Sequence, residues 1–195
     1  MLAVFMLSSP LIYAETMFPS ESPPLSLAEW RVKAGDVLLV DTKENVGYLI
    51  HEDAGFTSFP VVTGQRRTVR YIGRVYNAAT PAKKWYIESM EIKGDRTTFG
   101  PRGTFLRFFL GDEKTAYGIH AHKQGAEMLS SDERFRSYGC VIVSEEVMDI
   151  LAETFHANGE RIGVTTLYGL GEQSVTFEVL KKFVAHSSSR DVASR

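Results

Sequence analysis

Two short segments contain the residue types that nucleophilic catalysis needs. The single cysteine, Cys140, ends the run Ser137-Tyr138-Gly139-Cys140, and His120 precedes it by 140 − 120 = 20 positions, at the end of a predicted strand. A free thiol has a pKa of about 8.5, so it needs a base or a cationic neighbour to become a good nucleophile at neutral pH. A loop of this length can return the imidazole to the sulfur. The pattern predicts a Cys140–His120 pair, while a buried, inert cysteine is the alternative.

The neighbours of Cys140 are suited to position it. Gly139 lets the backbone approach a substrate carbonyl closely, and we expect the amides of Gly139 and Cys140 to face a developing oxyanion. Ser144, four residues after the cysteine, is a natural N-cap for a helix over 144–155, with Glu145 in its first turn. The positive end of that helix would favour a thiolate.

Most of the preceding chain has the pattern of short strands bounded by turn residues. Predicted strands lie at 36–41, 46–51, 57–63, 69–75, 85–92, 103–110, 116–120 and, after the helix, 161–167. A second helix is predicted less clearly over 175–183, and Trp30 and Trp85 are expected in the core. The sequence therefore predicts a mainly β domain with one or two helices, in a mixed β-sandwich or barrel-like fold.

The N-terminus has the composition of an export signal. Residues 1–14 contain no charged side chain, and the segment 18–27 is rich in Pro and Ser. We expect a signal peptide or anchor at 1–16, a linker at 17–34, a catalytic domain at 35–168 and a partly disordered extension at 169–195. Export would place the domain in the periplasm or cell wall, and a buried N-terminal strand or helix is the alternative.

Composition excludes several classes of protein. The 22 basic and 24 acidic residues give a net charge of −2, which argues against a general nucleic-acid binder. One cysteine excludes a disulfide framework and a multi-cysteine zinc site within the chain. His122 follows His120 at metal-ligand spacing, but no third ligand cluster is visible, so no metal is expected.

The Cys/His arrangement resembles that of the L,D-transpeptidase catalytic domain family, the YkuD-like domain. That family has a histidine at the end of a strand, then a loop, then Ser/Thr-x-Gly-Cys, here Ile119–Ala121 followed by Ser137–Cys140. Upstream, Phe59–Gly64 resembles its PV-x-TG strand, and Thr80-Pro81 resembles its TP segment. The resemblance covers about residues 35–168.

The resemblance implies a role for each residue of the motif. Cys140 would be the acylated nucleophile, and His120 would be its base and proton donor. Gly139 and Ser137 would shape the loop and the oxyanion site. Substrate contacts are expected from the flanking residues Tyr117, Arg136 and Tyr138.

The resemblance also implies a reaction. The family cleaves an L,D peptide bond in a peptidoglycan stem tetrapeptide, releases D-alanine and passes the acyl group to an amine, with no metal or organic cofactor. Such an enzyme would serve cell-wall biogenesis and cell shape. The expected partners are stem peptides, with no nucleic acid and at most a weak association with a membrane or the wall. A monomer is expected.

This chain departs from the family pattern in ways that leave alternatives open. Tyr138 replaces a common histidine, and Ile142 stands where an arginine suited to a substrate carboxylate is expected. Arg134 or Arg136 would supply that charge unless both lie on a solvated loop. The alternatives are an L,D-carboxypeptidase that uses water, and a wall-binding domain without catalysis. A further basic cluster, a solvated strand face or a contact to anionic wall polymer, comprises Arg66, Arg67, Arg70 and Arg74.

Overall fold

The computed structural model describes residues 24–170. The predicted signal peptide or anchor, the first part of the linker, the second helix over 175–183 and nearly all of the C-terminal extension lie outside the described residues. Within 24–170, no helix is both long enough and apolar enough to cross a membrane.

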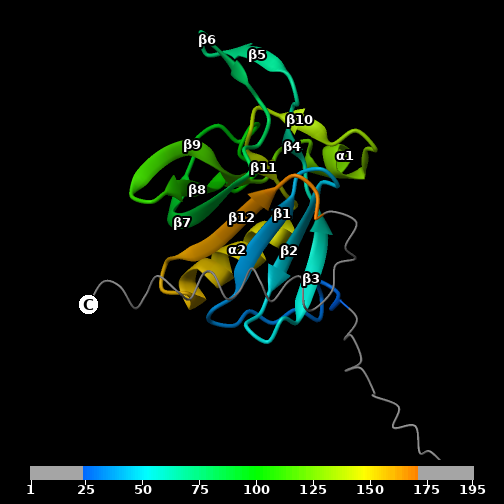
Figure 1. Cartoon of the computed structure of the whole chain (residues 1–195), viewed down its shortest axis with the longest axis vertical. Helices are drawn as coiled ribbons and strands as arrows, with labels where there is room; N and C mark the ends of the chain where they lie inside the picture. Colours follow the sequence, from blue (N-terminus) through cyan, green and yellow to red (C-terminus); the bar gives the residue numbers. More distant parts are fainter. Residues whose placement is uncertain (1–23, 171–195) are drawn as a thin grey trace, which may run out of the picture.

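The described chain alternates many strands with two helices (Figure 1). Their bounds are β1 Val37–Asp41, β2 Val46–Ile50, β3 Phe56–Pro60, β4 Thr63–Gly64, β5 Thr68–Tyr71, β6 Arg74–Asn77, β7 Lys83–Ile92, β8 Thr104–Leu110, β9 Glu113–His120, α1 Gly125–Ser130, β10 Phe135–Ser137, β11 Val141–Ile142, α2 Glu145–Ala157 and β12 Ile162–Leu167.

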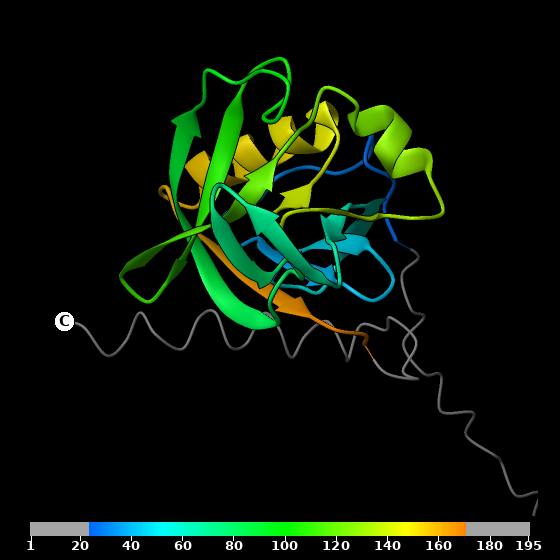
Figure 2. The same ribbon diagram turned by 90° about the horizontal axis from the view of Figure 1, so that it is seen from above.

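Eight of these strands form one mixed sheet in the order β11-β9-β8-β7-β12-β1-β2-β3. The pairs β1–β12 and β9–β11 are parallel, and the other neighbours are antiparallel. The sheet curls around α2, and the β5–β6 hairpin projects from the body (Figures 1 and 2). The prediction of a mainly β, barrel-like fold with one or two helices is confirmed.

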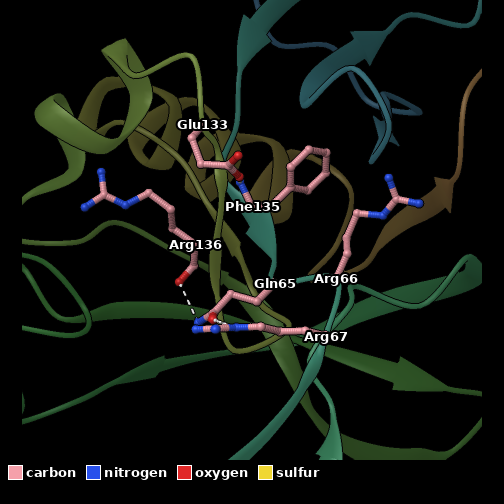
Figure 3. Close-up of a pocket in the computed structure, with 6 residues that line it drawn as sticks. All are labelled: Gln65, Arg66, Arg67, Glu133, Phe135 and Arg136. Atoms are coloured by element: carbon pink, nitrogen blue, oxygen red, sulfur yellow. Dashed lines mark hydrogen bonds between the residues drawn. The ribbon is translucent and has the colours of Figure 1, made fainter.

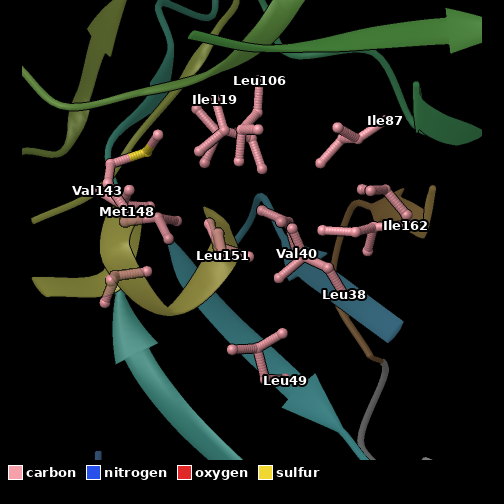
Figure 4. Close-up of a cluster of buried hydrophobic side chains, with 14 of the residues drawn as sticks. Leu38, Val40, Leu49, Ile87, Leu106, Ile119, Val143, Met148, Leu151 and Ile162 are labelled. Carbon is pink, nitrogen blue, oxygen red and sulfur yellow. The ribbon is translucent and has the colours of Figure 1, made fainter. Parts of the chain in front are cut away.

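The core lies between α2 and the inner face of the curled sheet. Ser144 caps the helix, because its Oγ accepts a hydrogen bond from the Val147 N–H at 3.2 Å, and the predicted stripe of Val147, Leu151 and Phe155 is buried. Figure 4 shows Leu151 of this helix together with strand residues of the same cluster, among them Leu38, Val40, Leu49, Ile87, Leu106, Ile119 and Ile162. The sheet edge that carries the site is therefore fixed by the same core as the helix.

One predicted strand is in fact a hairpin. The segment 69–75 turns at Ile72-Gly73, so that Tyr71 of β5 pairs with Arg74 of β6. Alternating side chains made the segment look continuous, whereas the positive φ of Ile72 and Gly73 reverses the chain. Helix α1 and the short strands β10 and β11 were also not predicted, because none is long enough to show a period.

Part of the predicted linker packs on the domain. The Leu25 N–H donates to Phe56 O at 2.8 Å, and Trp30 is only 4% exposed. The Trp30 ring stacks on His51 with 3.8 Å between centroids, and Nδ1 of His51 lies 2.6 Å from Asp36 Oδ1. The folded unit therefore begins before residue 35. Trp85 is buried as well, so the core assignment of both tryptophans is confirmed.

Candidate active site

The strand register brings Cys140 and His120 to one face of the sheet. Strand β11 starts directly after Cys140 and runs parallel to β9, with Val141 opposite Ile119 and Ile142 opposite His120. Val141 and Ile119 both point into the core. Because side chains alternate along a strand, Cys140 and His120 lie on the other face of these two neighbouring strands.

His120 is held as a neutral base. Its Nδ1 lies 2.7 Å from the Ala121 carbonyl oxygen. A carbonyl oxygen only accepts, so in the neutral ring Nδ1 carries the proton and Nε2 the lone pair. The side chain is buried against the rings of Phe99 and Phe105, and burial lowers the pKa of His120. The contact with Ala121 thus favours the tautomer that accepts a proton at Nε2.

Cys140 is a neutral thiol in this arrangement. Burial raises the pKa of the Cys140 thiol to about 11, although a hydrogen bond from the Gly118 amide and the charge of Arg107 act in the opposite direction. Its Sγ lies 3.9 Å from the Ala116 carbonyl oxygen. Among the described residues, no hydrogen bond joins Sγ to His120.

The side chain of Ser137 closes the loop before Cys140 with two hydrogen bonds. Ser137 Oγ donates to Cys140 O at 2.6 Å and accepts from the Gly139 N–H at 3.1 Å. Gly139 has a φ of +118°, and a Cβ there would lie 2.7 Å from Cε1 of Tyr117, so no other residue fits. The Gly139 N–H thus donates to Ser137, and it could donate to an oxyanion only if this hydrogen bond were broken.

Two upstream segments hold this loop from the other side. Thr80 Oγ1 donates to Gly139 O at 3.0 Å and accepts from the Gly64 N–H at 2.9 Å. A Cβ on Gly64 would lie 1.9 Å from the Ala78 carbonyl oxygen, so the close approach of these backbones requires glycine. The TG and TP segments therefore support the nucleophile loop. Thr80 was not among the predicted site residues, although its TP segment was part of the resemblance.

Aromatic side chains flank the loop. Tyr138 is exposed and stacks on Tyr71 of the hairpin with 4.4 Å between centroids. Tyr76 OH donates to Tyr138 O at 3.0 Å, which ties the second hairpin strand to the same residue. Tyr117 is half-buried beside Trp85, and burial raises its pKa. The β5–β6 hairpin and Tyr117 thus lie on two sides of the cysteine loop.

A positive charge that acts on the thiol comes from a residue that the sequence did not reveal. Arg107 of β8 pairs with Gly118 in the sheet register, next to the amide that contacts Sγ. Its guanidinium donates to both carboxylate oxygens of Glu91, at 2.6 and 2.9 Å, and to Thr115 O at 2.6 Å. This ion pair holds the pKa of Glu91 well below its usual range. The Glu91 pairing depends on the β7–β8 register, which contains an irregularity, so no sequence motif marks it.

Position 142, where the family pattern led us to expect an arginine, lies in an apolar environment. Ile142 is 3% exposed and packs in a small apolar cluster with Val62 and Met128. Of the two suggested substitutes, Arg134 donates to Glu44 O at 3.3 Å, and Nη2 of Arg136 lies 3.5 Å from Glu127 Oε1.

Arg136 lines a shallow pocket at the base of the hairpin (Figure 3). The pocket has a volume of about 590 Å³ and is lined by Gln65, Arg66, Arg67, Glu133, Phe135 and Arg136. Gln65 Nε2 donates to Arg136 O at 3.3 Å, and the Arg66 guanidinium lies 5.5 Å from the centroid of the Phe135 ring. With three arginines against one glutamate, the pocket is suited to an anionic group. Within the described chain, no group of three His, Cys, Asp or Glu is placed to hold a metal.

Comparison with solved structures places the fold. An L,D-transpeptidase from Xylanimonas cellulosilytica is 20% identical, covering 72% of this chain and 66% of that one, with a TM-score of 0.52. Bd1075 of Bdellovibrio bacteriovorus is 17% identical over 82% of this chain and 56% of that one, with a TM-score of 0.51. A mutant of the helical cell shape determining protein Pgp2 of Campylobacter jejuni is 13% identical over 81% and 55%, with a TM-score of 0.50. The chain thus spans less than two thirds of each of these proteins, and the likeness concerns the fold.

No curated protein matches the sequence. The sequence model of the YkuD family, described as the L,D-transpeptidase catalytic domain, matches residues 35–164. That match covers most of the sheet, α2 and both segments that contain His120 and Cys140. The chain therefore belongs to the L,D-transpeptidase catalytic domain family.

Proposed function

We propose that this protein is an exported cysteine L,D-transpeptidase that acts on peptidoglycan stem tetrapeptides. The observation that carries the proposal is the contact of His120 Nδ1 with Ala121 O, which leaves the lone pair of the neutral ring on Nε2, on the same sheet face as Cys140. A residue kept only for packing or for wall binding has no need of that arrangement. This favours an active enzyme over a binding domain that has lost catalysis.

The first half-reaction forms a thioester. Nε2 of His120 takes the thiol proton of Cys140, and the sulfur attacks the carbonyl carbon of the L,D peptide bond. The Cys140 N–H is the amide that we assign to the oxyanion, because the Gly139 N–H is bound to Ser137. When the C–N bond breaks, the proton on Nε2 passes to the departing amine of D-alanine.

The second half-reaction releases the product. His120 takes a proton from the acceptor amine, which attacks the thioester carbonyl, and the C–S bond breaks. The sulfur then regains its proton from His120. Arg107 supplies a fixed positive charge beside the sulfur whenever it is anionic, and thereby offsets part of the effect of burial. Neither half-reaction, as proposed, calls for a metal or an organic cofactor.

The arginine pocket is the element that we assign to carboxylates of the substrate. Arg136 precedes Cys140 by four residues, so its Cα lies within about 14 Å of the Cys140 Cα, even for a fully extended chain. An extended tetrapeptide has about the same length. One stem can therefore place its scissile bond at Cys140 and a free carboxylate at Arg136.

The place of action follows from the chemistry proposed. Peptidoglycan lies outside the cytoplasm, and the uncharged N-terminal segment 1–14 supports export to the periplasm or cell wall. The likeness in fold to a helical cell shape determining protein supports a role in wall biogenesis and cell shape. We propose a monomer.

The proposal is tested by incubating the purified protein with a disaccharide-tetrapeptide and an excess of a different D-amino acid, followed by mass spectrometry. Cys140→Ala protein is the matched control. Exchange of the terminal residue that is absent in the control supports transpeptidation by Cys140. Loss of D-alanine without exchange would identify water as the acceptor and replace the proposal with an L,D-carboxypeptidase. No reaction in either sample would overturn both.

A further inference from the structure

The β5–β6 hairpin carries an unbalanced positive charge. The segment 65–77 contains four arginines and no acidic residue, in a chain whose net charge is −2. Arg66 and Arg67 line the pocket at the hairpin base, whereas Arg70 and Arg74 flank the turn. All four side chains are exposed, and none forms an ion pair with another described residue. The charge of the hairpin is therefore available to a partner.

The tip of the hairpin is apolar and conformationally unfavourable. Ile72 and Gly73 form a two-residue turn with φ values of +48° and +74°, the pattern of a type I′ turn. Such turns favour Asn or Gly at the first position, and a β-branched residue there is strained. Ile72 is nevertheless 81% exposed, and Val75 beside it is 61% exposed. Neither folding nor solubility explains an isoleucine at this position.

The hairpin has one free face. Tyr71 and Tyr76 contact Tyr138 from the inner side, stacking on its ring and donating to its carbonyl oxygen. Alternation along the paired strands puts Arg70 and Val75 on the opposite face, with Ile72 at the end. Figure 1 shows this hairpin standing away from the body of the protein. Arg70 and Val75 therefore share the free face next to the exposed tip residue Ile72, whereas Arg74 lies beside the turn on the same face as Tyr71.

We propose that the β5–β6 hairpin docks this protein on an anionic lipid bilayer. Ile72 and Val75 enter the boundary between headgroups and acyl chains, and Arg70 and Arg74 contact lipid phosphates. An anionic wall polymer would use the arginines but has no apolar interior to receive Ile72. A bilayer uses both features. The inference is independent of the catalytic proposal, because it involves neither Cys140 nor His120.

Docking would also orient the candidate active site. The hairpin is held to the nucleophile loop by the Tyr71–Tyr138 stack, so a bound tip places that loop close to the membrane surface. The cysteine face would then be fixed relative to the bilayer, and wall peptides near the membrane would be the ones it reaches.

The test is co-sedimentation of the full chain with phosphatidylcholine vesicles and with vesicles that also contain phosphatidylglycerol. We expect binding to the anionic vesicles only. The double substitution Arg70→Gln/Arg74→Gln is expected to weaken it about fivefold for each arginine. Ile72→Asn is expected to weaken it about fivefold or more. The same substitution gives the turn its preferred Asn-Gly pair and should raise Tm by about 2–4 °C.

An exposed isoleucine elsewhere on the protein provides a matched control, and hydrogen exchange of the hairpin amides provides a local measurement. Ile92, at the end of β7, is 66% exposed, and Ile92→Asn is expected to leave vesicle binding unchanged. Hydrogen exchange should show slower exchange of the amides in 68–77 when vesicles are added, which separates the hairpin from any binding by the N-terminal segment. Unchanged binding by Ile72→Asn, unprotected hairpin amides, or binding to isolated cell walls but not to vesicles would each overturn the proposal.

Discussion

Arg107 and Cys140 contact adjacent peptide groups of strand β9. Nη1 of Arg107 donates to Thr115 O at 2.6 Å, and Sγ of Cys140 lies 3.9 Å from Ala116 O. The two side chains are thereby held to the same stretch of backbone from two different strands. A cation on β8 thus stands beside the sulfur in a protein that has Ile142 where its family resemblance led us to expect arginine.

This relationship predicts the direction in which Arg107 changes the thiol. Arg107→Gln removes the positive charge that favours the thiolate, so the pKa of Cys140 should rise further. Alkylation by iodoacetamide near neutral pH should slow by about tenfold. The measurement is the alkylation rate as a function of pH, and Arg107→Lys should recover part of the rate.

Glu91 provides the opposite change. Its carboxylate pairs with Arg107 and partly cancels that charge. Glu91→Gln should therefore lower the pKa of Cys140 and speed alkylation. If both substitutions moved the rate in the same direction, the effect would be structural, and Arg107 would have no electrostatic role.

Burial of His120 predicts how activity depends on pH. Its pKa is lowered below the usual value near 6.5, so the imidazole remains a neutral base throughout the neutral range. The apparent pKa of the acid limb of the kcat/KM pH profile, measured by D-amino-acid exchange, should consequently lie below that usual value.

The same shift also affects stability. Below the unfolded-state pKa near 6.5, the unfolded chain binds a proton that folded His120 does not, so stability should decrease as pH falls through that value. Burial lowers the pKa of His122 as well, in the same direction. Denaturant unfolding of His120→Gln and His122→Gln proteins at pH 5 and 7 separates the two contributions. A pH dependence in the His120→Gln protein as large as that of the wild type would contradict the assignment to His120.

Thr80 should matter for activity more than its distance along the sequence suggests. Thr80→Val leaves Gly139 O and the Gly64 N–H without their partner, which should cost about 1–3 kcal/mol of folding free energy. Because the nucleophile loop loosens, we expect kcat to fall about tenfold with a smaller change in KM. Thr80→Ser keeps the hydroxyl and should behave like wild type. A kcat of Thr80→Val equal to that of the wild type would show that the nucleophile loop keeps its conformation without Thr80.

Trp30 tests where the folded domain begins. Trp30→Ala should lower the free energy of unfolding by about 3–5 kcal/mol, because the ring is buried on His51. Trp30→Phe retains an aromatic ring and should cost less. Denaturant unfolding measures both. An unchanged stability of Trp30→Ala would show that the segment around Trp30 is a linker and not part of the folded domain.

Long periodic elements were predictable from the sequence. Strands β1, β2, β7, β8 and β12 and helix α2 lie where alternation, helical spacing and the Ser144 cap indicated. The family was predictable because its motif is local, with His120 ending one strand and Cys140 preceding another. The catalytic role of that pair remains a prediction.

Features set by tertiary register were not predictable. The turn at Ile72-Gly73 breaks the preference for Asn or Gly, so the sequence suggested one strand. Arg107 meets Glu91 and the cysteine only when β7, β8, β9 and β11 are aligned. Thr80 reaches Gly139 through space from a segment 59 residues earlier in the chain. Trp30 is likewise buried against His51, and no local sequence pattern links these two residues.

The central claim is that Cys140 carries the acyl group between donor and acceptor. Intact-protein mass spectrometry after rapid acid quenching, with a disaccharide-tetrapeptide and no amine acceptor, tests it most directly. We expect an adduct equal in mass to the donor less D-alanine, mapped by proteolysis to Cys140 and absent in Cys140→Ser protein. His120→Gln protein should form it much more slowly. Release of D-alanine by the Cys140→Ser protein, or an adduct on another residue, would show that Cys140 is not the nucleophile.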